Sequence, residues 1–402
     1  MRYDLTPLRN VLDANGNPEK EIPPSIHVAG TNGKGSTLTF LVAGFSKLGF
    51  RVGAYTSPHI EDYNERIAVN GHPVSKKIYA SFYQKAMDMA KTSKLTEFEL
   101  ITLAAILYFS QSSVDMVIWE TGLGGRLDAT NVITPNVSVI TPISMDHMDY
   151  LGETVEAIAQ EKAGIIKEGV PAFSSPQDYV VWEVLRKDAL SKNTRLLKSN
   201  DLKKLPDQSV MKGEFQKVNR GLALAVGKFS MENYDMLGIK GSEKVKNQST
   251  EAMEQLFNEG MDNASLFGRY QKISLNDCAS VIDAAHNLDG LVGLFTAMLM
   301  DPEMSGDIDV VIGLSKPSDR REILERCVEF QTEWERDKNG RIRWRYCQFD
   351  DKLSWHFDAV KSYFTGVDVK SIDLDDAKSL PWMGQTVITG SIYFISHFSF
   401  LV

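Results

Sequence analysis

The chain has 402 residues, 43% of them hydrophobic and 24% charged, which fits a globular protein long enough for two domains. Its net charge of −9 argues against a broad nucleic-acid surface, because such surfaces need clustered Lys and Arg. Cys278, Cys327 and Cys347 lie far apart without a zinc or redox spacing, which favours a reducing compartment. The N-terminus lacks the form of a secretory signal, and the apolar C-terminal stretch is shorter than the roughly 20 residues that cross a bilayer. We therefore expect a cytoplasmic protein with no nucleic-acid or membrane partner.

The first elements read as strand, loop and helix. Ser25–Ala29 predicts a β-strand, and the glycine-rich loop GTNGKGS follows it. An apolar-periodic stretch, Thr37–Leu48, then predicts a helix that stops at Gly49. Arg51–Thr56 predicts a second strand, so that the segment forms a βαβ unit with parallel strands.

Alternating helices and strands continue to the C-terminus. The pattern predicts helices at Phe98–Gln111, Thr154–Lys167, Leu288–Met300 and Arg320–Trp334, and strands at Asp115–Glu120, Asn136–Thr141, Ser280–Ala284, Asp309–Leu314 and Ile342–Phe349. Between the two halves, Met231–Ala264 is polar, apart from one expected helix near Glu251–Asn258, and it indicates the approach to a domain boundary. Both halves are thus α/β, and chemistry is expected in the loops after the strands.

The GTNGKGS loop has the residue types that hold a triphosphate. Its glycines permit tight turns, its amides open a helix, Lys34 would meet the β- and γ-phosphates, and the Ser36 hydroxyl would approach a phosphate or its metal. The general phosphate-loop pattern is missed twice, because Val28 stands at the first glycine position and Gly35 separates the lysine from the hydroxyl. The alternative interpretation is a glycine turn that only caps a helix.

A series of further motifs resembles the folylpolyglutamate synthases and dihydrofolate synthases of the Mur ligase superfamily. After GTNGKGS they are, in the family's order, YTSPHIEDYNERI, LTEFEL, ETGLGGRLDATN, DHMDYLG, EKAGI, GEFQKVN, GRYQ, DAAHN and TGSIYF. The resemblance implies an α/β fold with an N-terminal P-loop Mur-ligase-type nucleotide-binding domain at 1–266 and a smaller Rossmann-like glutamate-ligase domain at 267–402. It also implies an ATP-dependent ligase that adds L-glutamate to a folate-type carboxylate through an acyl phosphate.

The resemblance implies a magnesium site at the first domain. Ser57, Glu120 and His147 match the family's metal ligands, and two Mg²⁺ ions are expected. Lys162, in EKAGI, matches a lysine that these ligases carry as a carbamate, whose negative charge would suit a second metal ion. The alternative interpretation of Lys162 is an ordinary solvated lysine on a helix. A need for a monovalent cation is left open.

The resemblance also assigns the remaining substrate contacts. ATP would be bound by Asn32, Gly33, Lys34, Gly35 and Ser36 of the loop, together with Asn219, Arg269 and Asp283. His286 and Ser391 would hold the incoming glutamate, and the acceptor would lie against Thr96, Phe98, Asp128 and Ala129. In chemistry, Lys34 and Arg269 would stabilise the transferring phosphoryl group, and His286 or Asp283 would orient the amine or accept its proton. His147 and Lys162 complete the expected catalytic set.

The sequence departs from the family pattern at two positions. Phe267 stands where Pro is common before Gly-Arg, and Leu288 follows DAAHN where Pro is frequent. The acceptor can be dihydropteroate, a reduced folate, or both, and a monomer is implied. Rival interpretations are a ligase acting on a non-folate acceptor, a nucleotide-binding homologue without catalysis, and an ordinary P-loop kinase.

Overall fold

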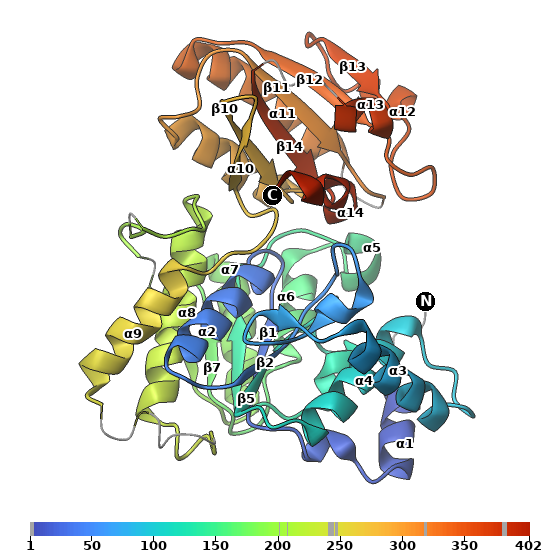
Figure 1. Cartoon of the computed structure of the whole chain (residues 1–402), viewed down its shortest axis with the longest axis vertical. Coiled ribbons are helices and arrows are strands. Elements are labelled where there is room, and N and C mark those ends of the chain that lie inside the picture. The colour runs from blue at the N-terminus through green and yellow to red at the C-terminus, as the bar shows by residue number, and fades with distance from the viewer. Residues whose placement is uncertain are drawn as a thin grey trace. The chain divides into compact units, whose positions relative to one another are not determined.

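The computed structural model describes residues 4–200, 202–206, 208–239, 245, 248–316, 320–379 and 384–402. The chain forms two compact units. Unit 1 comprises Met1–Val210 with Gln216–Ala264, and unit 2 comprises Met211–Phe215 with Ser265–Val402 (Figure 1). The domain ranges expected from the sequence, 1–266 and 267–402, stay a prediction. Among the described residues, no helix is both long and apolar enough to cross a bilayer.

Unit 1 is built on an eight-stranded sheet in the described residues, with the order β4-β3-β2-β5-β1-β6-β7-β8. Strands β2 to β8, apart from β3 and β4, run parallel with β1, and β3 and β4 pair antiparallel at the edge. The strands are β1 Ser25–Ala29, β2 Val52–Tyr55, β3 Ile67–Val69, β4 His72–Pro73, β5 Met116–Glu120, β6 Val137–Ile140, β7 Ala172–Ser174 and β8 Leu196–Lys198. The expected βαβ unit is therefore present, with β5 inserted between its two strands.

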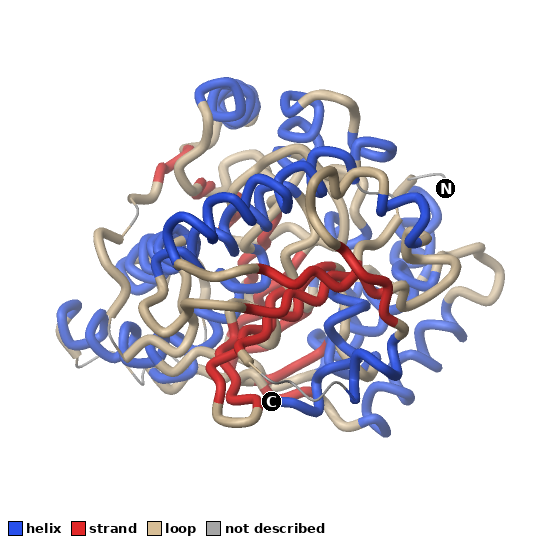
Figure 2. Tube along the Cα trace, turned by 90° about the horizontal axis from the view of Figure 1, so that it is seen from above, coloured by secondary structure: helices blue, strands red, loops and turns tan. Residues whose placement is uncertain are grey.

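The helices of unit 1 follow from the apolar stretches of the sequence. They are α1 Thr6–Ala14, α2 Lys34–Lys47, α3 Lys76–Met89, α4 Glu97–Gln111, α5 Met148–Leu151, α6 Val155–Ala163, α7 Tyr179–Ser191, α8 Phe215–Glu232 and α9 Thr250–Asp262, with 3₁₀ turns at Pro18–Lys20, Tyr63–Arg66 and Ala129–Val132. Helix α6 ends at Ala163 and is shorter than predicted. At the next residue, Gly164, the chain passes so close to Arg126 that a Cβ would lie 2.4 Å from the Arg126 Cα. Figure 2 shows the helices in blue and the strands in red.

One aromatic ring fixes the packing of three helices in unit 1. Phe257 of α9 is fully buried. A Cβ added at Gly44 of α2, or at Gly227 of α8, would lie 2.5 Å from its ring. Two glycine notches therefore receive this ring, one on each neighbouring helix.

Unit 2 holds a six-stranded sheet in the described residues, in the order β13-β12-β11-β14-β10-β9. Among the six described strands of this sheet, β9 alone pairs antiparallel. The elements are β9 Gln271–Leu275, β10 Cys278–Asp283, α10 Leu288–Met300, β11 Ile308–Gly313, α11 Arg320–Lys338, β12 Ile342–Cys347, α12 Phe357–Lys361, β13 Val369–Ile372, α13 Leu374–Ser379, β14 Gln385–Gly390, α14 Ile392–Ile395 and the 3₁₀ turn Ser396–Leu401.

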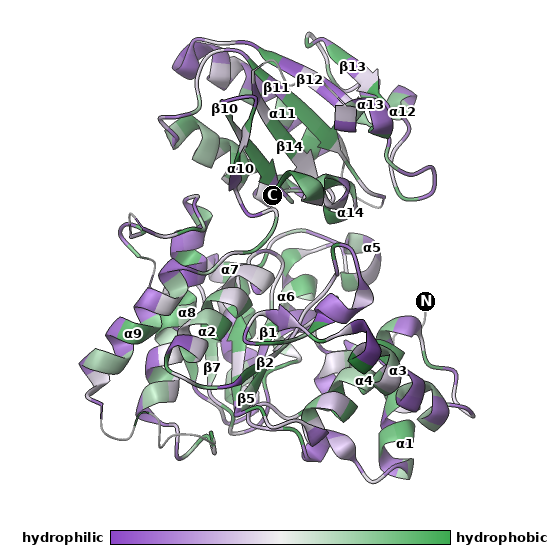
Figure 3. Cartoon of the chain, viewed as in Figure 1, coloured by the Kyte–Doolittle hydropathy of each residue, from purple (hydrophilic) through white to green (hydrophobic). Residues whose placement is uncertain are grey.

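Both faces of the unit 2 sheet are buried. Val281 of β10 and Val387 of β14 pack into one apolar cluster, whereas their neighbours Ile282 and Ile388 pack into another. The second cluster includes Phe398, so the apolar C-terminal stretch packs against one face of this sheet. Figure 3 shows the central strands in the green of hydrophobic residues. The α/β class predicted for the chain is confirmed in both units.

Candidate active site

The GTNGKGS loop joins β1 to α2. Gly33, directly before the helix, has φ 87°, a value that favours glycine. Contact with α8 restricts this position further, because a Cβ on Gly33 would lie 2.2 Å from Asn219 Oδ1. Lys34 begins the helix and donates from Nζ to the carbonyl oxygens of Gly30 and Thr31, at 3.1 Å each. A lysine and the amides of a helix N-terminus therefore meet at the loop, as anion binding requires.

The segment after β6 anchors this loop. Thr31 N and Asn32 N donate to the carbonyl of Pro142 at 2.9 and 3.3 Å. Thr31 Oγ1 also accepts from Ser144 N and donates to Ser144 O, each at 3.1 Å. The phosphate loop is thus held at the carboxyl ends of two neighbouring parallel strands, where open α/β sheets bind ligands.

A second lysine reaches the same loop from α6. Lys162 is only 4% exposed, and its Nζ donates to the Gly30 carbonyl at 2.8 Å. Burial, together with the charge of Lys34, lowers the pKa of Lys162 to about 7. The Lys162 side chain is therefore not the solvated helical lysine of the alternative interpretation.

Helix α8 contributes a polar network on the other side of the loop. Gln216 is fully buried, and its Nε2 donates to Ser36 Oγ at 3.3 Å. Its Oε1 accepts from Asn219 Nδ2 at 3.0 Å, which directs the Asn219 carbonyl oxygen towards Gly33. Gln216 therefore connects two of the residues predicted to bind ATP, and it was not among the predicted site residues.

Two of the expected metal ligands lie together. Glu120, at the end of β5, is 5% exposed, and its Oε2 accepts from Ser57 N at 3.2 Å. His147 precedes α5, and its Nε2 lies 3.8 Å from Asp146 Oδ1. Among the described residues, no group of three or more His, Cys, Asp and Glu side chains could hold a metal ion by itself. A magnesium site here would thus depend on other oxygen donors, such as Ser57 and the nucleotide, and the ligand set stays a prediction.

The residues expected to contact the acceptor cluster around β5 and α4. Thr96 caps α4, accepting from Glu99 N at 3.3 Å, and Phe98 lies in its first turn. The Phe98 ring packs against Gly122, where a Cβ would lie 2.5 Å away. Asp128 Oδ2 accepts from the amides of Gly122 and Leu123, both at 2.9 Å. Ala129 is buried in the apolar core beside α4.

In unit 2, Asp283 ends β10 and is 5% exposed. Its Oδ2 accepts from Tyr270 N at 2.6 Å. Burial raises the pKa of Asp283 to about 6, while the nearby Arg269 and backbone hydrogen bonds oppose the rise. The Arg269 guanidinium donates to the carbonyl of Gly268 at 3.0 Å. Two residues predicted to act on ATP, Arg269 and Asp283, are therefore electrostatically coupled.

The residues expected to bind glutamate follow adjacent strands of the same sheet. His286 follows β10 and donates from Nδ1 to the Ala284 carbonyl at 2.8 Å. Ser391 follows β14, and Ser315 follows β11. The two hydroxyls lie 2.5 Å apart. Unit 2 thus gathers an imidazole and two hydroxyls at one edge, and Ser315 was not predicted.

A family comparison is decisive for this chain. The Mur ligase middle domain matches residues 28–248, more than half of the sequence. The chain belongs to the Mur ligase family. Within it, the resemblance to folylpolyglutamate and dihydrofolate synthases is confirmed by individual relatives. The "Dihydrofolate synthase/folylpolyglutamate synthase" of Bacillus subtilis is 46% identical over 189 residues, which cover 45% of this chain and 44% of that protein.

Solved structures extend the likeness over nearly all of this chain. A Mycobacterium tuberculosis folylpolyglutamate synthase complexed with ADP and AMPPCP has a TM-score of 0.81 at 25% identity, covering 100% of this chain and 95% of that one. A bifunctional folylpolyglutamate synthase/dihydrofolate synthase from Yersinia pestis, complexed with AMPPNP and a Mn ion, has a TM-score of 0.78 at 26% identity, covering 99% and 93%. In sequence, the chain spans about half the length of the curated relatives it matches.

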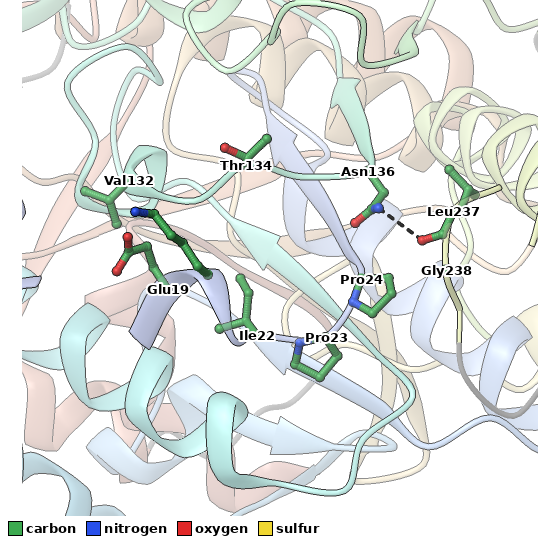
Figure 4. Close-up of a pocket in the computed structure, with 10 residues that line it drawn as sticks. Glu19, Ile22, Pro23, Pro24, Val132, Thr134, Asn136, Leu237 and Gly238 are labelled. Atoms are coloured by element: carbon green, nitrogen blue, oxygen red, sulfur yellow. Dashed lines mark hydrogen bonds between the residues drawn. The ribbon is translucent and has the colours of Figure 1, made fainter. Parts of the chain in front are cut away.

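A cavity of about 460 Å³ lies elsewhere in unit 1. Pro24, before β1, and Asn136, before β6, line it, and Asn136 Nδ2 donates to the Leu237 carbonyl at 3.0 Å (Figure 4). The cavity is thus at the amino ends of the strands, opposite to the edge that carries the phosphate loop. In parallel sheets ligands bind at the carboxyl ends, so we place the site at the loop rather than in this cavity.

Proposed function

We propose that this chain is an ATP- and Mg²⁺-dependent ligase that joins L-glutamate to the carboxylate of a folate-type acceptor in the cytoplasm, acting as a monomer. One observation carries the proposal. Lys34 and Lys162 donate to the same carbonyl of a glycine-rich loop whose helix also presents the Ser36 hydroxyl. The Lys34 amino group and a helix N-terminus at one loop suit a triphosphate, while Lys162 lies against the same carbonyl from behind. The nucleotide complexes of the relatives from M. tuberculosis and Y. pestis support this assignment.

The first step would activate the acceptor. A carboxylate is a poor electrophile and must first be activated. One of its oxygens attacks the γ-phosphorus of ATP, and the bond from that phosphorus to the β,γ-bridging oxygen breaks. ADP departs, and the acceptor carboxylate has become an acyl phosphate. Lys34 and the loop amides from Asn32 to Ser36 would hold the phosphates, with Asn219 contacting the nucleotide beside Gly33. Arg269 would stabilise the charge on the transferring group. Positioning and electrostatics dominate such catalysis.

A divalent metal fits the residues at this edge. Glu120 supplies a buried carboxylate next to Ser57, and hard oxygen ligands of this kind suit Mg²⁺. Ser57, Glu120 and His147 would hold the ion, in line with the Mn ion of the Y. pestis relative. When bound, it would neutralise charge on the phosphate oxygens. A second Mg²⁺ ion would be held by the carbamate of Lys162. Whether activity needs a monovalent cation is tested by assaying with and without such a salt.

The Lys162 amine suits carbamate formation. Only a neutral amine reacts with carbon dioxide, forming an N–C bond and releasing a proton. Because burial lowers its pKa to about 7, a large fraction of Lys162 is neutral near physiological pH. We propose that Lys162 acts as this carbamate.

The second step would form the amide. The glutamate amine attacks the acyl carbon, the C–O bond to phosphate breaks, and the nitrogen loses a proton. His286 and Ser391 would bind the glutamate. His286 or the Asp283 carboxylate would orient the amine or accept its proton. In His286 the acting nitrogen would be Nε2, because Nδ1 donates to the Ala284 carbonyl.

The acceptor would lie against Phe98, whose ring is partly exposed and rests on Gly122. Thr96, Asp128 and Ala129 would shape this part of the site. The proposed acceptors are dihydropteroate and a reduced folate.

One assay tests the proposal. The protein is incubated with ATP, Mg²⁺, L-glutamate and one acceptor at a time, and the products are read by mass together with phosphate release. We expect a product heavier by one glutamyl unit and one phosphate per product. Phosphate release with glutamate but only with a non-folate acceptor would replace the folate assignment. ATP binding without glutamate-dependent phosphate release would overturn the ligase assignment altogether.

A further inference from the structure

A buried histidine lies behind the phosphate loop. His27 is on β1, three residues before Gly30, and is fully buried. Its Nε2 lies 2.8 Å from Thr130 Oγ1, and Thr130 is itself fully buried. Burial, reinforced by the charge of Lys167, lowers the pKa of His27 to about 3. The ring is therefore neutral at any physiological pH and is suited to holding a hydrogen bond rather than to carrying charge.

The direction of the hydrogen bonds follows from the single proton of the threonine hydroxyl. Thr130 Oγ1 donates to Asp128 Oδ1, which also accepts from Thr130 N at 2.9 Å. Since that proton is committed, Thr130 Oγ1 accepts from His27, and the His27 proton is on Nε2. The other ring nitrogen, Nδ1, is buried and has no hydrogen-bond partner within the described part of the chain. The ring is thus fixed through Nε2 alone.

The far end of this chain of hydrogen bonds is the turn after β5. Asp128 Oδ2 accepts from the amides of Gly122 and Leu123, both at 2.9 Å. These residues directly follow Glu120 and Thr121, and Thr121 N donates to the carbonyl of Val28 at 3.0 Å. The strand that leads into the phosphate loop is therefore tied to this turn twice, by the Val28 carbonyl and by the His27 side chain.

The Gly122–Leu123 turn also supports Phe98, against which the acceptor would lie. Gly122 packs against the Phe98 ring so closely that a Cβ would lie 2.5 Å from it. A shift of the Gly122 backbone must therefore move Phe98 or open a gap beneath it. The His27 side chain is linked to this surface through Thr130 and Asp128.

We propose that His27 is a positioning residue, which acts through Thr130 and Asp128 to fix the Gly122–Leu123 turn and thereby the acceptor surface at Phe98. The part of this inference that concerns the acceptor rests on the proposed function. The part that concerns the turn does not, because it is a statement about backbone order that can be measured without any substrate.

Two pairs of variants test the hydrogen-bonded chain. His27→Leu removes the donor, and His27→Gln retains an N–H donor. Thr130→Val keeps the shape and removes the hydroxyl, and Thr130→Ser retains it. Ser138→Ala is the matched control, because Ser138 is a buried hydroxyl beside His27 in the sheet, but it donates to Ile165 O instead.

Hydrogen exchange of the amides, read by mass spectrometry, is the first measurement. We expect exchange in the peptide covering 121–128 to accelerate about tenfold in Thr130→Val and His27→Leu, with less effect in Thr130→Ser and His27→Gln. Peptides covering β7 should be unchanged, as should the 121–128 peptide in Ser138→Ala. Unchanged exchange at 121–128, or an equal rise in all peptides, would overturn the proposal.

Steady-state kinetics is the second measurement. Thr130→Val and His27→Leu should raise the KM for the acceptor about tenfold and leave the KM for ATP within about twofold. A merely structural defect would raise both together, which would contradict the positioning role. If the unmodified protein uses no folate acceptor, the proposed function fails, while the exchange measurement still decides the role of His27.

Discussion

Lys34 and Lys162 direct their amino groups to one oxygen atom, the carbonyl of Gly30, at 3.1 and 2.8 Å. The two residues come from different helices and play different parts. Lys34 belongs to the loop that would hold the triphosphate, whereas Lys162 is buried behind it. The positive charge of Lys34 helps to lower the pKa of Lys162, so the Lys162 amine is more often neutral and can react with carbon dioxide.

The first prediction concerns Lys34. Lys34→Ala should lower kcat for glutamate-dependent phosphate release by roughly 100-fold or more, because loss of one charge contact in the transition state commonly costs about 3 kcal/mol. Lys47→Ala is the matched control, since Lys47 is in the last turn of the same helix and its ion pair with Glu259 is exposed. Full activity of Lys34→Ala would contradict the loop assignment.

The second prediction separates stability from activity at Lys162. Its pKa is about 7 when folded and about 10.5 when unfolded, so the unfolded chain binds more protons between these values. The stability contributed by this group is therefore lost as pH falls from about 10.5 to 7. Lys162→Met removes that loss, and it should be more stable than the unmodified protein at pH 7 while lacking activity.

The measurement is chemical denaturation of both proteins between pH 7 and 9.5 in buffer depleted of carbon dioxide. The advantage of Lys162→Met should shrink as pH rises. A stability advantage that is constant or grows with pH would show that burial does not lower the pKa of Lys162. In the activity assay, added bicarbonate should stimulate the unmodified protein and leave Lys162→Met inactive.

The third prediction concerns Asp283 in unit 2. Burial raises its pKa to about 6, so the carboxylate ionises in the folded protein between pH 5 and 7. If the charged form supports catalysis, kcat should rise with pH through about 6. Asp283→Asn keeps an acceptor for Tyr270 N but cannot ionise. It should lower kcat at least tenfold and abolish that rise.

Stability provides an independent check on the same carboxyl group. Between about pH 3.8 and 6 the folded state holds this proton more tightly than the unfolded state, so the contribution to stability is present at low pH and lost as pH rises through 6. The stability of Asp283→Asn relative to the unmodified protein should therefore increase as pH rises from about 3.8 to 6. A relative stability independent of pH would contradict the raised pKa.

The fourth prediction concerns Gln216. Gln216→Leu would leave Ser36 and Asn219 without their buried partner, which commonly costs about 1 to 3 kcal/mol. We expect the KM for ATP to rise about tenfold. Gln255→Leu is the control, because Gln255 is on the neighbouring helix α9 and bonds to Glu259 at the surface. An equal effect of both substitutions would argue against a role at the phosphate loop.

The periodicity of the sequence predicted individual elements well. Strand β1 and helix α10 were placed at their observed bounds, Ser25–Ala29 and Leu288–Met300, because apolar spacing and flanking polar residues define both locally. Helix α6 ends at Ala163, before Gly164, whereas the prediction extended to Lys167 because the apolar pattern continues through Ile165 and Ile166.

Side-chain partners remote in sequence were beyond such reasoning. The motifs located Asn219 and Ser36, but Gln216 is 180 residues from Ser36, and only the folded chain reveals their hydrogen bond. His27 is likewise 103 residues from Thr130. GEFQKVN contains Gln216 and ETGLGGRLDATN contains Thr130, but neither motif indicates what these side chains would contact.

The ring of Phe257 has a mechanical consequence for nucleotide recognition. It fills notches at Gly44 on the helix that follows the phosphate loop and at Gly227 on the helix that carries Asn219. The Phe257 ring thus sets the distance between α2, which follows the phosphate loop, and α8, which carries Asn219, before any ligand binds. A side chain at either notch would force these helices apart and widen the grip, so affinity for ATP would depend on two positions that never touch it.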